Sequence, residues 1–72
     1  MKCEQFCGLI HDIFPELEEV LPEQRIASDL GLCSFDIMMI IVQIEELYGC
    51  QVDVSLIKKD MTVREFFSVV YR

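Results

Sequence analysis

The stretch Asp29-Leu30-Gly31-Leu32-Cys33-Ser34-Phe35-Asp36 leads from a loop into the most hydrophobic helix that the sequence predicts. This helix runs from Ser34 to Tyr48, and Gly49 supplies the expected C-terminal stop. Helical spacing puts one set of side chains on a face that we assign to the core: Ile37, Ile40, Ile41, Ile44, Leu47 and Tyr48. The opposite face carries Phe35, Met38, Met39 and Val42, with Gln43, Glu45 and Glu46. So apolar a helix is either buried on both sides or docks a partner, and a short chain favours docking.

Upstream of this helix, apolar residues recur at helical spacing from Cys3 to Phe14, and Pro15 ends that helix. The connection from Pro15 to Cys33 is long, and we expect its apolar residues to pin it to the core: Leu17, Val20, Leu21, Ile26, Leu30 and Leu32. Downstream, residues 55–60 are expected to form one or two helical turns. The capping box Thr62-Val63-Arg64-Glu65 then opens a last helix.

The expected fold class is therefore all-α. We predict an irregular four-helix bundle with a long loop between the first two helices and a short third helix. A chain of 72 residues allows one domain, 1–72, with one small core and no deep catalytic cleft.

Charge and composition exclude several classes of function. The net charge of −7 disfavours binding to nucleic acid or to an anionic membrane. The longest apolar run, from Ile37 to Val42, is too short to span a bilayer, so no stable membrane insertion is expected. The polar N-terminus has no signal-peptide pattern, which favours a cytoplasmic protein with four reduced cysteines. One histidine and no catalytic arrangement of side chains argue against an enzyme.

Three motifs occur in order: the stretch from Asp29 to Asp36, then Glu45-Glu46-Leu47-Tyr48-Gly49, then Thr62-Val63-Arg64-Glu65-Phe66. In these the chain resembles the acyl carrier protein family, with its peptidyl and D-alanyl carrier relatives. The resemblance implies that Ser34 carries 4′-phosphopantetheine, derived from coenzyme A, through a phosphodiester. The arm's thiol would hold acyl or aminoacyl cargo as a thioester. It also implies a phosphopantetheinyl transferase and ligase, transferase or synthase enzymes as partners, in fatty-acid or specialised polyketide or peptide synthesis.

A helix N-terminus suits the proposed attachment, because unpaired backbone N–H groups and the helix dipole stabilise a phosphate. An ordinary N-cap role for Ser34 is the competing interpretation. Cys33 departs from the family, which usually has Asp or a small polar residue there, and Phe35 replaces a leucine. Asp36 matches the family's acidic residue. We expect the transferase to recognise these three neighbours of Ser34, namely Cys33, Phe35 and Asp36.

Partner docking is assigned to the outward face of the second helix: Phe35, Met38, Met39, Val42, Glu45 and Glu46. The competing interpretation is that its apolar residues pack under the long loop. We expect Ile37, Ile41 and Ile57 to line a groove that shelters an apolar acyl chain. Lys58 and Lys59 stand where the family is often acidic, and we interpret them as a solvated face.

Two other functions stay open from the residues alone, and the protein is expected to be a monomer in each case. One is a helical interaction module that keeps the carrier fold without the arm. The other is a small metal or redox protein, since Cys3, Cys7 and His11 are spaced by four on one helix. We favour core packing for the two cysteines, a surface position for His11 and no metal. A disulfide between Cys33 and the arm's thiol is a further, weaker hypothesis.

Overall fold

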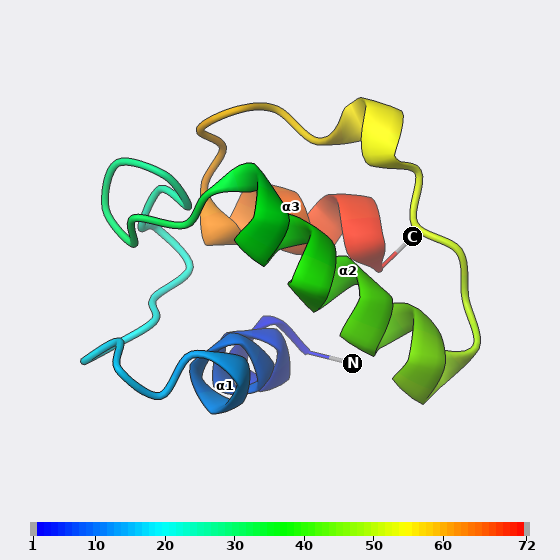
Figure 1. The fold of residues 1–72 in the computed structure, drawn as a ribbon, viewed down its shortest axis with the longest axis horizontal. Helices are drawn as coiled ribbons and strands as arrows, with labels where there is room; N and C mark the ends of the chain where they lie inside the picture. The colour runs from blue at the N-terminus through cyan, green and yellow to red at the C-terminus, as the bar shows by residue number, and fades with distance from the viewer. Residues whose placement is uncertain (1, 72) are drawn as a thin grey trace.

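Three α-helices and one short 3₁₀ helix form the fold in the computed structural model, which describes residues 2–71. They are α1 (Cys3–Ile13), α2 (Ser34–Tyr48), η1 (Val54–Leu56) and α3 (Val63–Val70). Figure 1 shows α3 behind α2, with α1 below them and η1 on the connection between α2 and α3. The prediction of an all-α chain with a long first loop and a short third helix is confirmed, although only three of the four helices are α-helical.

Local sequence signals set the helix ends. Gly49 adopts the left-handed conformation, with φ of 63°, and its N–H donates to the Glu45 carbonyl oxygen at 2.9 Å. The predicted capping box of α3 is present, because Thr62 Oγ1 accepts the Glu65 N–H at 3.1 Å. Glu65 Oε1 accepts the Thr62 N–H in return, at 2.9 Å. These contacts satisfy backbone groups that the helix itself leaves unpaired.

The third helix is shorter than predicted and lies earlier in the chain. It covers only Val54–Leu56, and the backbone is already extended at Ile57, with ψ of 119°. The reason lies in Asp60, whose carboxylate accepts the backbone N–H groups of Ala27 and Ser28 at 3.1 and 3.0 Å. These contacts hold residues 57–60 against the long loop, where a continued helix would not place them.

The core gathers buried side chains from every α-helix and from the loops. Phe6 of α1 meets Phe66 of α3 edge to face, with ring centroids 5.2 Å apart. The predicted inner face of α2 supplies Ile37, Ile40, Ile41 and Ile44, all of them buried. The remaining buried hydrophobic residues are Cys7, Ile10, Ile26, Leu30, Leu32, Val52, Met61, Val63 and Val70.

Two residues assigned to the inner face of α2 do not reach the core. Leu47 is 60% exposed and Tyr48 is 57% exposed. In Figure 1 the C-terminal turn of α2 extends past the ends of α1 and α3. The face was predicted correctly as far as Ile44, but the core ends before the helix does.

The long loop is ordered by its own buried residues and by backbone hydrogen bonds to the α3 region. Ile26, Leu30 and Leu32 are buried as predicted, Leu17 and Val20 are half-buried, and Leu21 is 41% exposed, which corrects its assignment to the core. The Ile26 N–H donates to the Met61 carbonyl oxygen, and the Val63 N–H donates to Gln24, both at 2.9 Å. These bonds fix the loop before it reaches Ser34. None of the helices within residues 2–71 has the length and apolarity needed to cross a bilayer.

Candidate functional site

Ser34 is the first residue of α2, and its side chain is exposed. The helix is capped by Cys33, whose backbone is extended, and the Cys33 N–H donates to Asp36 Oδ2 at 3.0 Å. The ordinary N-cap role considered for Ser34 is therefore wrong. Cys33 and Asp36 form the capping interactions at the start of α2. The Ser34 hydroxyl is therefore not needed to cap the helix.

The Ser34 hydroxyl differs from those of the other serines in the described part of the chain. Ser55 Oγ donates to Asp53 Oδ1 at 2.6 Å, and Ser68 Oγ donates to the Glu65 carbonyl oxygen at 2.7 Å. The Ser28 side chain hydrogen-bonds to Asp60. Among the serines within residues 2–71, Ser34 alone has a hydroxyl that makes no hydrogen bond to the protein.

The turn before Ser34 explains the role of the Asp29-Leu30-Gly31 motif. Asp29 Oδ2 accepts the Arg25 N–H at 2.7 Å, and Gly31 donates to the Ala27 carbonyl oxygen at 2.9 Å. Gly31 has φ of 71°, a conformation that costs other residues steric strain. Leu30 and Leu32, on either side of it, are buried. This motif therefore has a structural role, because it forms the turn that positions the start of α2.

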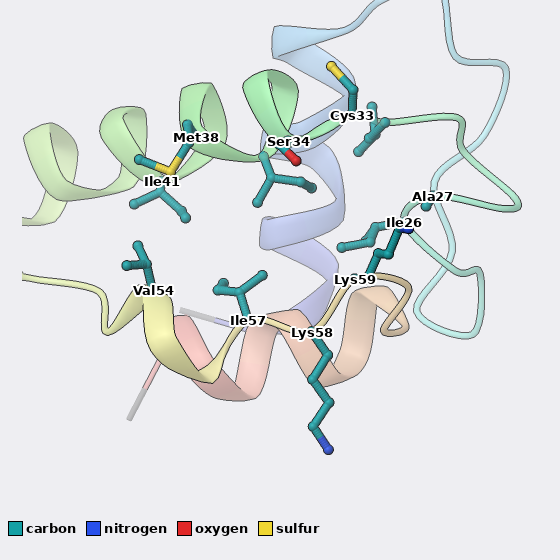
Figure 2. Close-up of a pocket in the computed structure, with 12 residues that line it drawn as sticks. Ile26, Ala27, Cys33, Ser34, Met38, Ile41, Val54, Ile57, Lys58 and Lys59 are labelled. Carbon is teal, nitrogen blue, oxygen red and sulfur yellow. The ribbon is translucent and has the colours of Figure 1, made fainter.

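A groove of about 620 Å³ lies between α2 and the segment that follows η1. The three residues expected to shelter a cargo, Ile37, Ile41 and Ile57, all line it. The other lining residues are Ile26, Ala27, Leu32, Cys33, Ser34, Met38, Val54, Lys58 and Lys59. In Figure 2, Ser34 and Cys33 lie toward one end of the groove, and Ile41 and Val54 toward the other. The attachment candidate thus sits on the rim of an apolar groove.

Sequence reasoning missed several of the residues that line this groove. Ile26 and Ala27 come from the long loop, and Val54 comes from η1. No helical periodicity links them to α2, because they meet it only through tertiary contacts. The apolar residues of the loop predicted packing against the core, but they did not predict that a groove would form there.

Charges near the groove come from the segment before α3. Hydrogen bonds from the Ser28 backbone and side chain, then from the Ala27 backbone, hold the pKa of Asp60 below its ordinary value, and Arg25 acts in the same direction. Arg25 Nη1 also donates to the Asp60 carbonyl oxygen at 2.8 Å. Asp60 is therefore an anion engaged by its neighbours, whereas Lys58 and Lys59 make no ion pair within residues 2–71.

The outward face of α2 is open to solvent. Phe35 is 62% exposed, and Met38, Met39 and Val42 are exposed as well, so they do not pack under the long loop. Glu46 is exposed too, but Glu45 is half-buried and its Oε2 accepts the Val52 N–H at 3.0 Å. Of the two acids assigned to docking, Glu45 thus has a structural contact and Glu46 has none within residues 2–71.

The cysteines lie in different environments, and all four are free thiols. Cys7 is buried, as predicted, and burial followed by the proximity of Cys3 raises its pKa to about 11. Cys3 is half-buried against the core, while His11 is half-buried rather than on the surface. Among residues 2–71, no three His, Cys, Asp or Glu side chains gather where they could hold a metal ion.

Comparison with known proteins gives one family. The model of the phosphopantetheine attachment site matches residues 4–69, which is nearly the whole chain. No solved structure shows a significant match to the chain.

Proposed function

The chain belongs to the phosphopantetheine attachment site family, that of the acyl carrier proteins, and on this premise we propose that Ser34 is the residue that carries the arm. Domains of this family are carriers, generally without catalytic activity of their own, that hold covalent 4′-phosphopantetheine. The protein would hold acyl or aminoacyl intermediates as thioesters and present them to biosynthetic enzymes. The observation that carries the proposal is the exposed Ser34 hydroxyl, which has no hydrogen-bond partner within residues 2–71.

The surroundings of Ser34 fit a covalently attached phosphate and its arm. The first-turn N–H groups of α2 and the helix dipole favour an anion at this end. The groove on whose rim Ser34 lies offers apolar surface to an arm or its cargo. The bound arm supplies the thiol that forms the thioester, and the protein's own residues attach and orient it.

The residues next to Ser34 are proposed to meet the transferase. Phe35 is well exposed and offers an aromatic contact of the kind that dominates many interfaces. Asp36 holds the first turn in place through its bond to the Cys33 N–H, so it positions Ser34 as much as it presents charge. Cys33 is exposed and occupies the N-cap, where a thiol makes no charged contact with the transferase.

Enzymes that load or use the cargo are proposed to dock on the outward face of α2. Its exposed apolar residues, Phe35, Met38, Met39 and Val42, support contacts that are mainly hydrophobic. Methionine side chains adapt to irregular partner surfaces. Glu46 adds an exposed acid, while Glu45 contributes through its support of residue 52.

The groove supports an apolar acyl cargo, because isoleucines at positions 37, 41 and 57 supply much of its lining. Both fatty-acid synthesis and a specialised polyketide or peptide pathway use such cargo. We favour a specialised pathway, because the docking face is more apolar than that of fatty-acid carriers. A methyl NMR titration with acylated protein tests the groove: shifts at these isoleucines are expected, and unchanged shifts would contradict it.

Intact mass spectrometry tests the attachment site. Wild type, Ser34→Ala and Ser68→Ala are incubated with coenzyme A and a broad-specificity phosphopantetheinyl transferase. Ser68→Ala is the matched control, since the Ser68 hydroxyl is already bonded to Glu65. Wild type and the control should each gain one phosphopantetheine, and Ser34→Ala should gain none. A gain on Ser34→Ala would contradict the assignment.

The interaction module without an arm is the second candidate. The exposed apolar face of α2 and the departure at Cys33 favour it. This hypothesis replaces the carrier function if folded wild-type protein gains no mass even with the transferase of its own pathway.

A further inference from the structure

Two adjacent lysines stand out in a chain that holds thirteen acidic residues against six lysines and arginines. The two arginines within residues 2–71 are engaged: Arg64 pairs with Glu23 at 3.0 Å, and Arg25 donates to the Asp60 carbonyl oxygen. Lys58 and Lys59 make no ion pair in the described chain, although Lys58 acts electrostatically on Glu65, and both belong to the lining of the groove. A cation without a partner in the groove that Ser34 also lines, on an acidic protein, suggests an anionic ligand.

The two lysines point in different directions. Figure 2 shows the Lys58 side chain turned away from the groove, while the Lys59 ammonium is turned toward Ala27. Ala27 also lines the groove, on the loop that leads to Ser34. Lys59 is therefore the cation directed to the end of the groove where Ser34 lies.

Hydrogen bonds hold the backbone of Lys59 close to that loop. Its neighbour Asp60 accepts the N–H groups of Ala27 and Ser28, and the Asp60 carbonyl oxygen accepts from Arg25. The nearby carboxylates are also engaged, because Asp29 accepts the Arg25 N–H and Asp36 accepts the Cys33 N–H. Thus hydrogen bonds hold the residue next to Lys59, while the long flexible side chain of Lys59 can still reach an anion.

We propose that the Lys59 ammonium binds the phosphodiester of the arm on Ser34 and holds the base of the arm at the mouth of the groove. This inference rests on the proposed function. A carboxylate on the cargo is the other oxyanion that a lysine could bind. The phosphate is favoured because it is bonded directly to the serine oxygen, whereas the cargo lies beyond the whole arm.

Phosphorus NMR of the arm-bearing protein tests the contact. Wild type, Lys59→Gln and Lys58→Gln are prepared with the arm attached and no cargo, and mass spectrometry first verifies attachment. Lys58→Gln removes the same charge one residue away, so it is the matched control. The ³¹P resonance should shift in Lys59→Gln and stay at the wild-type position in Lys58→Gln. High salt should move the wild-type resonance toward that of Lys59→Gln, because salt screens an exposed ion pair.

The outcomes separate this inference from the function on which it rests. If no variant accepts the arm, both fail. If all accept it and Lys59→Gln keeps the wild-type resonance, or Lys58→Gln shifts it equally, the phosphate contact is overturned and the carrier function stands. A Lys59→Gln effect that appears only after loading with a dicarboxylic acyl group assigns the lysine to the cargo and also overturns the proposal. Both lysines are exposed, so neither substitution should unfold the protein.

Discussion

Asp60 accepts the backbone N–H of Ser28 at 3.0 Å, and this contact ties the segment before α3 to the loop that leads to Ser34. The two residues are far apart in sequence, yet their contact positions the floor of the groove relative to the attachment candidate. The same carboxylate also accepts the Ala27 N–H, at 3.1 Å. An ionised side chain therefore contributes to the geometry of the site, together with the backbone hydrogen bonds from Ile26 to Met61 and from Val63 to Gln24.

Acid should weaken this tie. The pKa of Asp60 is lowered in the folded state from an ordinary value of 3.8, first by the Ser28 hydrogen bonds. Its contribution to the free energy of unfolding is fully present above pH 3.8 and is lost as the pH falls through the lower folded-state pKa. Asp60→Asn should therefore have a lower free energy of unfolding than wild type at neutral pH. The difference in free energy between the two proteins should become smaller as the pH falls below 3.8. Urea unfolding at a series of pH values measures it.

The control for Asp60 is Glu18→Gln, which removes an exposed loop carboxylate that makes no hydrogen bond within residues 2–71. Its stability should follow the wild-type pH profile. A difference between Asp60→Asn and wild type that stays constant from neutral to strongly acidic pH would contradict the linkage.

Neighbouring acids on α2 should behave differently when they are removed. Glu45→Ala loses the hydrogen bond to the Val52 N–H, and a hydrogen bond to a charged group contributes about 1.5–3 kcal/mol. Glu46→Ala removes the same charge from an exposed position, so its effect on the free energy of unfolding should stay within about 0.5 kcal/mol. Thermal melts of both variants measure the difference, and equal melting temperatures would contradict the structural role of Glu45.

Two glycines should respond to alanine in opposite directions. Gly49 has φ of 63°, and alanine in the left-handed region costs roughly 1–2 kcal/mol. Gly8 lies within α1, and a Cβ added there meets nothing within 4 Å, so alanine should stabilise the helix by roughly 0.5–1 kcal/mol. Calorimetry should show a lower melting temperature for Gly49→Ala and a higher one for Gly8→Ala. Shifts of the same sign would contradict the assigned conformations.

The sequence predicted the elements that have local signals. The Thr62 and Glu65 capping box, the Gly49 stop and the buried isoleucines of α2 all follow from short-range patterns. Ser34 was placed correctly at the start of α2. Its free hydroxyl was not predictable, because the partners of the other serines and the capping contact of Asp36 depend on the folded backbone.

The features that were predicted wrongly depend on tertiary contacts, which local sequence patterns do not reveal. Helical periodicity identified the inner face of α2, but it carries no information about where the core ends, so Leu47 and Tyr48 were wrongly assigned. The helix expected over residues 55–60 does not form, because Asp60 makes hydrogen bonds to the distant loop instead. For the same reason, Lys59 appeared as an ordinary surface charge until the fold placed it beside Ala27.

The last prediction concerns docking of the transferase on α2. Phe35 and Leu47 are similarly exposed, at 62% and 60%, but they lie at opposite ends of the helix. If the transferase contacts the Ser34 end, Phe35→Ala should lower kcat/KM for modification by about tenfold, since an interface aromatic commonly contributes more than 1 kcal/mol. Leu47→Ala should leave kcat/KM near wild type. Neither change removes a buried side chain, so circular dichroism melts should match wild type, and any loss of rate can be assigned to the contact. Equal loss in both variants, or none in Phe35→Ala, would place the transferase elsewhere.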